Sequence, residues 1–413
     1  MTALASARAP VFLLLYSAAL IASIAEGFFL LLPLFVKSIG GTEIDVGWIL
    51  WGGAAGSVLL VGSVSKLLDY LRPAAIAALG CASYAAGAGI FAFTYHVGLV
   101  CDAAGFFQGA GVGLSVTAYP MVVSALVDDR KRSVHFSVLA AFGIAGMGIS
   151  PVIGAFARAH GIDYHLIFQA SAIMSLISAA LLALLDRAPA GGRVRSPHRA
   201  APRGALRSVL ASEAVFPLIM VFLGTCMFSA MFTFQTTFAV SRGLDFQIFY
   251  ACYITATIAA RLTLSKFVSR ADPHAMTVFL LALVCCALAS YAFVGSNPLL
   301  YGAASALLGT SYGLAYPLVQ AHAVNLTAPA LRERVLAYFS FLYFFAAFGF
   351  PLAGGWVIVR YGYEAFMLVV LAVGVAQLSV ACFHWRARAR TVAGQAQRAL
   401  PRRPAIGRPI GAG

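Results

Sequence analysis

The sequence predicts an all-α membrane protein with twelve transmembrane helices in two pseudo-symmetric six-helix bundles. Hydrophobic residues make up 61% of its 413 positions and charged residues only 10%, and the mean hydropathy is +0.89. Apolar runs reach about 20 residues without the alternation expected of barrel strands. Because lipid cannot hydrogen-bond backbone groups, uninterrupted runs of this length indicate helices.

Short polar or basic connectors separate the apolar runs. The predicted spans are 10–36, 45–65, 74–94, 97–126, 136–157, 163–185, 214–240, 246–269, 274–294, 298–326, 336–359 and 363–384. The first run is too long for the apolar part of a signal peptide and lacks a small-residue cleavage site, so it is interpreted as a span.

The basic residues predict the orientation. With the N-terminus in the cytoplasm, 23 of the 28 Lys and Arg residues fall on the cytoplasmic side, and only Lys37, Arg158, Arg242 and Arg360 fall outside. The positive-inside rule therefore predicts a cytoplasmic (inner) membrane protein with both termini cytoplasmic. The net charge of +14 is spread over connectors rather than gathered in one patch, so no nucleic-acid partner is expected.

The chain divides into four parts. They are an N-terminal bundle (1–185), a flexible basic cytoplasmic linker (186–213), a C-terminal bundle (214–384) and a disordered basic tail (385–413). Three short matches recur between the bundles at offsets of 197 or 200 residues: Ser65–Lys66 with Ser265–Lys266, Ala118–Tyr119–Pro120 with Ala315–Tyr316–Pro317, and Pro151 and Gly154 with Pro351 and Gly354. Such parallel repeats predict a binding site at their interface.

With these spans, this linker and this repeat, the chain resembles the major facilitator superfamily from about Val11 to Trp385. The fifth span carries Gly146, Ser150, Pro151 and Gly154. This pattern looks like the family's antiporter motif, with Ser150 and Ala155 in place of two glycines. The predicted helix-bend motif comprises Gly146, Pro151 and Gly154, together with Pro351 and Gly354, which repeat it in the second bundle. In the family this motif is associated with export by proton exchange.

Two other family motifs are altered. Lys66 stands where the connector after the second span has an acidic residue, and Gly105 stands where the fourth span has an arginine. The family's cytoplasmic charge lock and its helix-four arginine therefore cannot be carried over. The residues assigned to gating are Lys66, Asp69, Arg72, Arg261 and Lys266. Arg261 has two interpretations, a gate residue, which we favour, or the partner of an anionic substrate.

Two carboxylates are candidates for proton coupling. Glu26 lies near the middle of the first span, where a low dielectric favours the neutral acid, so this residue can take up and release a proton. Asp102 lies near the outer end of the fourth span. Glu26 would also suit a cationic substrate, and Asp102 a cation site. The competing interpretations are a neutral structural glutamate for Glu26 and a wetted interfacial aspartate for Asp102.

The resemblance implies that spans 1, 4, 7 and 10 line a central cavity. Besides Glu26, the candidate cavity residues are Gln108, Tyr119, Gln235, Tyr316 and Gln320. Interhelical hydrogen bonding is the alternative role for Gln108 and Gln235, and packing beside a bend is the alternative for the tyrosines. The aromatic residues of 228–234 and 338–346 are interpreted as lipid-facing or core residues.

The function predicted is secondary active transport of a small organic molecule by alternating access, with proton-coupled export. A small-solute importer and a non-transporting membrane sensor remain alternatives. No P-loop, zinc-binding H-E-x-x-H or nucleophile–base set occurs in the sequence, so neither an ATP-driven pump nor an enzyme is expected. We expect no cofactor and no metal. The expected partners are the substrate, protons and membrane lipid, and the chain is expected to act as a monomer.

Overall fold

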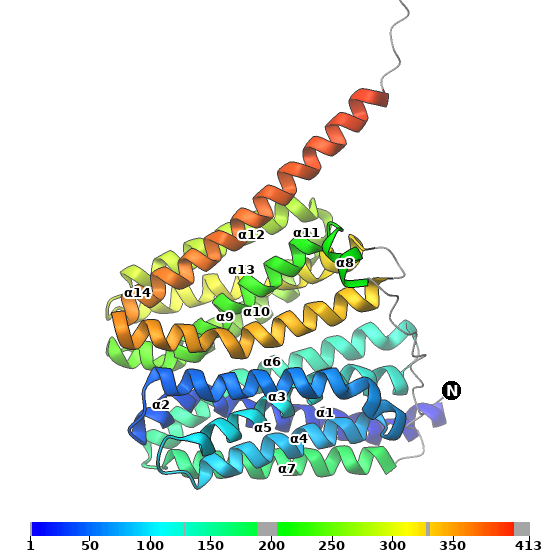
Figure 1. Cartoon of the computed structure of the whole chain (residues 1–413). Coiled ribbons are helices and arrows are strands. Elements are labelled where there is room, and N and C mark those ends of the chain that lie inside the picture. The colour runs from blue at the N-terminus through cyan, green and yellow to red at the C-terminus, as the bar shows by residue number, and fades with distance from the viewer. Residues whose placement is uncertain (1, 128, 188–204, 328–330, 400–413) are drawn as a thin grey trace, which may run out of the picture.

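The computed structural model describes residues 2–127, 129–187, 205–327 and 331–399, and helices dominate it. The helices form two groups, and Figure 1 shows the second group above the first. The first group contains α1 (Thr2–Gly27), η1 (Phe28–Leu31), α2 (Leu32–Ser38), α3 (Glu43–Tyr70), α4 (Pro73–Ala92), α5 (Leu99–Leu126), α6 (Asp129–Ala159) and α7 (Tyr164–Arg187). The second contains α8 (Ala205–Leu210), α9 (Val215–Ser241), α10 (Phe246–Thr263), α11 (Ser265–Arg270), α12 (Pro273–Ser290), η2 (Tyr291–Phe293), α13 (Pro298–Asn325) and α14 (Arg332–Ala399).

The predicted all-α membrane fold is confirmed, although the helices do not match the twelve predicted spans one to one. The first span is divided into α1, η1 and α2, and the eighth into α10 and α11. The last two spans run on as α14, which bends at Gly362, where φ is 83°. Among the described residues, nine helices are long and apolar enough to cross a membrane. The chain is therefore a multi-pass membrane protein.

The connectors contain the expected helix-start signals. Pro73, Pro273 and Pro298 each lie in the first turn of their helix, where a missing N–H costs nothing. At the start of α3, Thr42 and Asp45 form a capping box, and the Asp45 carboxylate accepts the Thr42 backbone N–H at 2.7 Å. These signals hold the turns short, so consecutive helices pack antiparallel.

The prediction of a disordered tail from residue 385 is wrong for its first part. Helix α14 continues to Ala399, because Ala, Arg and Gln are all strong helix formers. The predicted flexible linker, 186–213, also contains helix: α7 extends to Arg187 and α8 covers Ala205–Leu210. Positions 188–204 and 400–413 lie outside the described residues.

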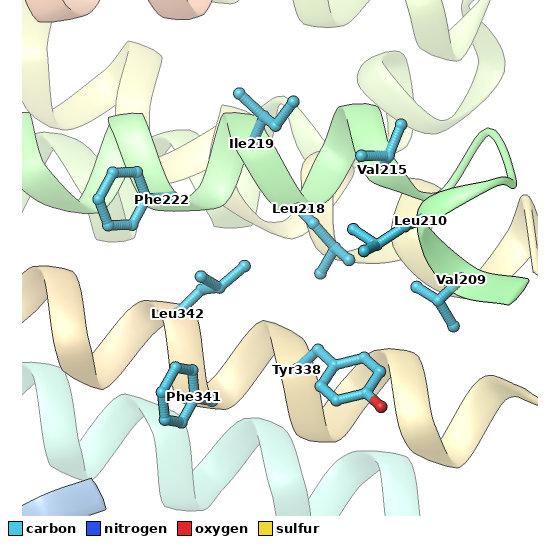
Figure 2. Close-up of a pocket in the computed structure, with 9 residues that line it drawn as sticks. All are labelled: Val209, Leu210, Val215, Leu218, Ile219, Phe222, Tyr338, Phe341 and Leu342. Carbon is cyan, nitrogen blue, oxygen red and sulfur yellow. The ribbon is translucent and has the colours of Figure 1, made fainter. Parts of the chain in front are cut away.

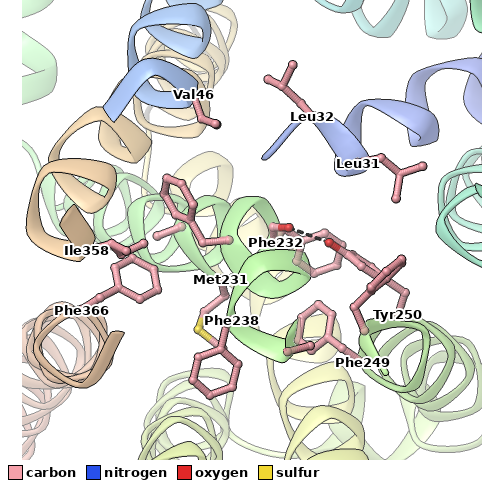
Figure 3. Packing of buried hydrophobic residues seen from close by; sticks show 14 of the residues in the cluster. Leu31, Leu32, Val46, Met231, Phe232, Phe238, Phe249, Tyr250, Ile358 and Phe366 are labelled. Carbon is pink, nitrogen blue, oxygen red and sulfur yellow. Dashed lines mark hydrogen bonds between the residues drawn. The ribbon is translucent and has the colours of Figure 1, made fainter. Parts of the chain in front are cut away.

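The two ends of the helices differ in charge and in packing. We call the end that carries Arg72, Arg187, Arg207, Arg270 and Arg332 the basic end, and the other the opposite end. At the basic end each group has its own buried apolar cluster. Toward the opposite end one cluster contains residues of both groups. Figure 3 shows part of it, with Leu31 and Val46 of the first group and Phe232 and Ile358 of the second.

Glycines allow the groups to meet at the opposite end. A methyl group on Gly355 of α14 would lie 2.0 Å from the backbone carbonyl oxygen of Glu43 in α3, and one on Gly47 would lie 2.5 Å from the Cα of Leu352. Such close backbone approach is typical of small residues between membrane helices. The opposite end is therefore sealed between α3 and α14.

The basic end is hollow between the same helices. A cavity of about 590 Å³ lies between α3, α5 and α14. Its wall includes Val61 and Ser65 of α3, Met121 of α5, and Tyr338 and Phe341 of α14. The two groups thus touch at one end and leave an open space between them at the other.

Tight glycine packing within the first group gives a stability prediction. A methyl group on Gly109 of α5 would lie 2.0 Å from the backbone oxygen of Gly53 in α3, whereas nothing lies within 4 Å of the same position on Gly89. Overpacking typically costs about 1–3 kcal/mol. We expect Gly109→Ala to lower the unfolding temperature of the detergent-solubilised protein, measured by differential scanning fluorimetry. Gly89→Ala is the control, and equal unfolding temperatures for the two variants would contradict this packing.

Candidate functional site

A cavity of about 220 Å³ lies at mid-height between the two helix groups. Two of its lining residues come from α6 of the first group, and the others come from α9, α10, α13 and α14 of the second. They are Ile144, Met147, Phe228, Phe232, Tyr253, Ile254, Thr257, Arg261, Tyr312, Gly313, Tyr316 and Tyr343. We call this space the central cavity.

Three residues of α10 form a polar stripe on the wall of the central cavity. Tyr253, Thr257 and Arg261 are spaced four residues apart, so they lie on one face of the helix. The Thr257 hydroxyl donates toward the Gly309 carbonyl oxygen at 2.9 Å, and the Arg261 Nε–H donates to the Gly313 carbonyl oxygen at 3.2 Å. Both contacts tie α10 to α13. They leave the remaining guanidinium N–H groups at the cavity.

The rest of the wall is largely aromatic. Phe228 and Tyr312 stack with ring centroids 5.0 Å apart and an interplanar angle of 9°. Tyr316 meets Tyr343 at 5.8 Å between centroids. Flat apolar faces with hydroxyl groups at their edges can hold a planar molecule and orient its polar atoms.

Glu26 lies where the first span loses its α-helical form. Helix α1 ends at Gly27 and is followed by the 3₁₀ segment η1. Pro33, in the first turn of α2, has no N–H to donate to a carbonyl four residues back. Side chains of neighbouring helices hydrogen-bond the backbone carbonyls just before the break: Ser150 to Ile24 at 2.7 Å, Ser171 to Ala25 at 2.9 Å, and Tyr84 to Glu26 at 3.2 Å.

The Glu26 side chain has no ion-pair or hydrogen-bond partner among the described residues. The adjoining Gly27 packs against α6. A methyl group on it would lie 2.5 Å from the Ser150 Oγ and 2.9 Å from the Cα of Met147, and Met147 is one of the residues that line the central cavity. Gly146 is equally close to α1, because a methyl group on it would lie 2.6 Å from the Cβ of Ser23. The Gly146–Ser150 segment of α6 thus joins the helix break to the cavity wall.

The bend prolines and glycines lie in buried positions. Pro151 is inside α6 and Pro351 inside α14. A methyl group on Gly154 would lie 2.2 Å from a methyl carbon of Leu31, and one on Gly354 would lie 3.1 Å from the Phe366 ring. Small residues thus permit close helix packing in both bundles.

Of the five uncharged residues predicted to line the cavity, Tyr316 does so. Gln235 is buried in the second group, where its Oε1 accepts the Tyr301 hydroxyl at 2.8 Å. Gln108 is also buried, and neither of its side-chain polar atoms has a partner among the described residues. Tyr119 lies in the first group with its hydroxyl 3.7 Å from the Cys81 Sγ, and Gln320 is exposed.

The residues assigned to gating do not form one cluster. Lys66 and Asp69 are exposed at the end of α3. Arg72 donates from Nη1 to the Asp186 carbonyl oxygen at 2.9 Å, which links α4 to α7 inside the first group. The side chain of Lys266 lies outside the described residues. Arg261 faces the central cavity.

Polar residues bridge the two groups at the opposite end. The Lys37 ammonium lies 2.6 Å from the Glu43 Oε1, and the Tyr363 hydroxyl of α14 donates to the same oxygen at 2.5 Å. We call these three residues the opposite-end bridge. Asp102, in the first turn of α5, lies at this end as well and belongs to neither the bridge nor the central cavity.

Another cavity, of about 530 Å³, lies between α8, α9 and α14 at the basic end (Figure 2). Leu218, Phe222 and Leu342 are part of its wall, and the Tyr338 hydroxyl is its polar group. A wall of this kind offers little that could orient a polar solute. The central cavity, with Arg261 and four tyrosines, is therefore the candidate site. No group of His, Cys, Asp and Glu suited to a metal ion occurs among the described residues.

Comparison with known proteins identifies the family. The family model described as the Major Facilitator Superfamily matches residues 14–351. The chain belongs to the major facilitator superfamily. Among solved structures, the chain is similar to the nucleoside transporter NupG, with a TM-score of 0.76, 14% sequence identity, and coverage of 91% of this chain and 99% of that one. A point mutant of NupG matches with the same TM-score and 12% identity. A search of curated proteins finds no match.

At 14% identity the likeness to NupG establishes the superfamily fold alone. Membership in this superfamily identifies the chain as a secondary transporter that crosses the membrane several times.

The aromatic residues around 228–234 and 338–346 were predicted from the sequence to face lipid or the core. The structure places Phe228, Phe232 and Tyr343 in the wall of the central cavity instead. Four-residue spacing was the available signal, since Phe228 and Phe232, and likewise Tyr312 and Tyr316, share a helix face.

Proposed function

We propose that this protein exports a small organic molecule across the cytoplasmic membrane by alternating access, in exchange for protons bound at Glu26. The observation that carries the proposal is the lone Glu26 carboxyl at a helix break, beside a glycine that packs on the cavity wall. An acid in a low-dielectric setting alternates readily between its neutral and charged forms as water reaches it. Broken helices next to a midplane site are typical of secondary transporters.

The two ends of the molecule support rocking as the mechanism. At the opposite end, Gly47 and Gly355 allow backbone contact between α3 and α14, while the same helices border a cavity at the basic end. With the basic end in the cytoplasm, this is a conformation closed to the outside. Rocking residues 1–185 against 214–384 would break the first set of contacts and close the second space.

The opposite-end bridge is proposed as the outer lock. Lys37 and Glu43 come from the first group and Tyr363 from the second, so rocking must separate the Tyr363 hydroxyl from the Glu43 carboxylate. Because Glu43 is paired with the Lys37 ammonium, its hydrogen bond to Tyr363 is charge-assisted and worth about 1.5–3 kcal/mol. The sequence assigned a gating role to Lys66 near the basic end of α3, whereas the proposed outer lock lies at the other end of the same helix.

The test is proton movement in proteoliposomes that contain a trapped pH-sensitive dye. Nucleosides, cationic dyes and aromatic sulfonates are added in turn, on either side, with and without a pH gradient. We expect one class to drive proton flux in the reverse direction to its own movement. Flux in the same direction would make the protein an importer by symport, and no transport of any compound by a monodisperse protein would favour the non-transporting sensor.

A further inference from the structure

We propose that the central cavity binds a small organic anion bearing one aromatic or heteroaromatic ring, with the anionic group held by Arg261. This proposal rests on the proposed transport function and adds the class of substrate. It also replaces the gating role that the sequence favoured for Arg261.

The first argument is the state of the Arg261 guanidinium. Its Nε–H is bonded to the Gly313 carbonyl oxygen, and the described residues place no carboxylate within ion-pair distance of it. A guanidinium keeps its charge at any physiological pH and presents its N–H groups as a fork that fits a carboxylate or sulfonate. A charge lock would need an acidic partner on the other helix group. The partner that completes this site is therefore an anion from solution.

The second argument is the composition of the wall. No acidic residue lines the central cavity, so a cation would meet only Arg261 and aromatic faces. The stacked Phe228–Tyr312 pair offers a flat surface. The hydroxyls of Tyr316 and Tyr343 form no hydrogen bond with a described residue, which leaves them free to donate to an anion beside the guanidinium.

The third argument is size. The central cavity measures about 220 Å³, while an apolar protein cavity of about 150 Å³ accommodates benzene. One ring with a carboxylate group therefore fills the space in this conformation. Aromatic contact adds about 0.5–1.5 kcal/mol beyond the burial of area, so an aromatic ring is favoured over a saturated ring of the same size.

The test is equilibrium binding of radiolabelled benzoate to the purified full chain in detergent, with no gradient. Unlabelled benzoate, benzamide and cyclohexanecarboxylate are the competitors. We expect benzamide, which lacks the charge, to compete at least about tenfold less well than benzoate. Cyclohexanecarboxylate, which lacks the aromatic ring, should compete about 2- to 12-fold less well. Two results with the native protein would each overturn the proposal: no saturable binding of benzoate, or competition by benzamide as strong as that by unlabelled benzoate.

Variants then locate the anion. Arg261→Gln should weaken benzoate binding by about 10- to 150-fold, and Arg261→Lys should recover part of the loss. Arg158→Gln is the matched control, since Arg158 is a half-exposed arginine near Asp163, outside the central cavity. Unchanged binding by a monodisperse Arg261→Gln protein would refute the assignment. Because no proton is measured, intact benzoate binding together with absent proton flux would refute the coupling mechanism and leave the substrate class standing.

Discussion

Substitution Glu26→Gln should reduce substrate-driven proton movement in proteoliposomes to the level of empty liposomes. Glutamine keeps the size and hydrogen-bonding capacity of the neutral acid but cannot lose a proton, so the carrier would be held in its protonated state. Binding and counterflow of substrate should persist, because the central cavity itself is unchanged. The measurement uses a trapped pH dye, with benzenesulfonate as one probe because this strong acid does not carry protons across lipid by itself.

Asp102→Asn is the matched control for this experiment. Asp102 is the other acidic residue assigned to proton coupling from the sequence, and it lies at the opposite end of α5, away from the central cavity. We expect its substitution to leave proton flux within about twofold of the native value. If Glu26→Gln kept coupled proton flux and Asp102→Asn lost it, the proton-binding residue would be Asp102. That result would refute the claim that the proton binds at Glu26, at the break after α1.

Substitution Gly355→Ala should produce the second large effect, by opening the opposite end. Its methyl group would lie 2.0 Å from the Glu43 backbone oxygen, which belongs to the start of α3 and cannot rotate away. This clash is removed only if α3 and α14 separate, so the substitution should destabilise the closed form by about 1–3 kcal/mol. Such a cost changes the ratio of the two conformations by about 5- to 150-fold. The measurement is the rate at which a cysteine introduced at Leu352 is alkylated. Leu352 lies at the contact between α3 and α14, beside Gly47, so opening of this end should raise the rate.

The control uses Gly62→Ala, on the same helix as Glu43. Nothing lies within 4 Å of a methyl group at Gly62, so the stability of the closed form should not change. The cysteine at position 352 should then be alkylated at the same rate as in the protein that keeps both native glycines. If Gly355→Ala and Gly62→Ala were alkylated at the same rate, the contact between α3 and α14 would not be the seal of the opposite end.

Much of the fold follows from the sequence because lipid imposes simple rules. Run length and composition were enough to predict the all-α membrane fold. The small residues of the fifth span were recognised as a motif, but their contact with the first span is known only from the structure. The tail was misjudged, because its charged and polar composition suggested disorder while its Ala and Arg residues favour helix as far as Ala399.

The site was only partly predictable, because cavity walls depend on which faces of distant helices meet. Glu26 stood out as a carboxylate within an apolar run, and Tyr316 as part of a repeated motif. Arg261 was noticed, but its orientation toward aromatic residues of α9, α13 and α14 depends on helix packing that no local pattern records. Gln235 shows the same limit, because its partner Tyr301 is 66 positions away in the chain.

The central claim is that the two helix groups rock about the cavity, and distances between spin labels test it most directly. One pair, Trp48→Cys with Trp356→Cys, joins exposed positions of α3 and α14 toward the opposite end. The other, Tyr70→Cys with Leu336→Cys, joins the same helices at the basic end. Both are made after replacement of the seven native cysteines. We predict two distance populations for each pair, with one pair lengthening as the other shortens when pH or substrate is changed. A single, unchanging distance for both pairs in a protein that still transports would contradict the account.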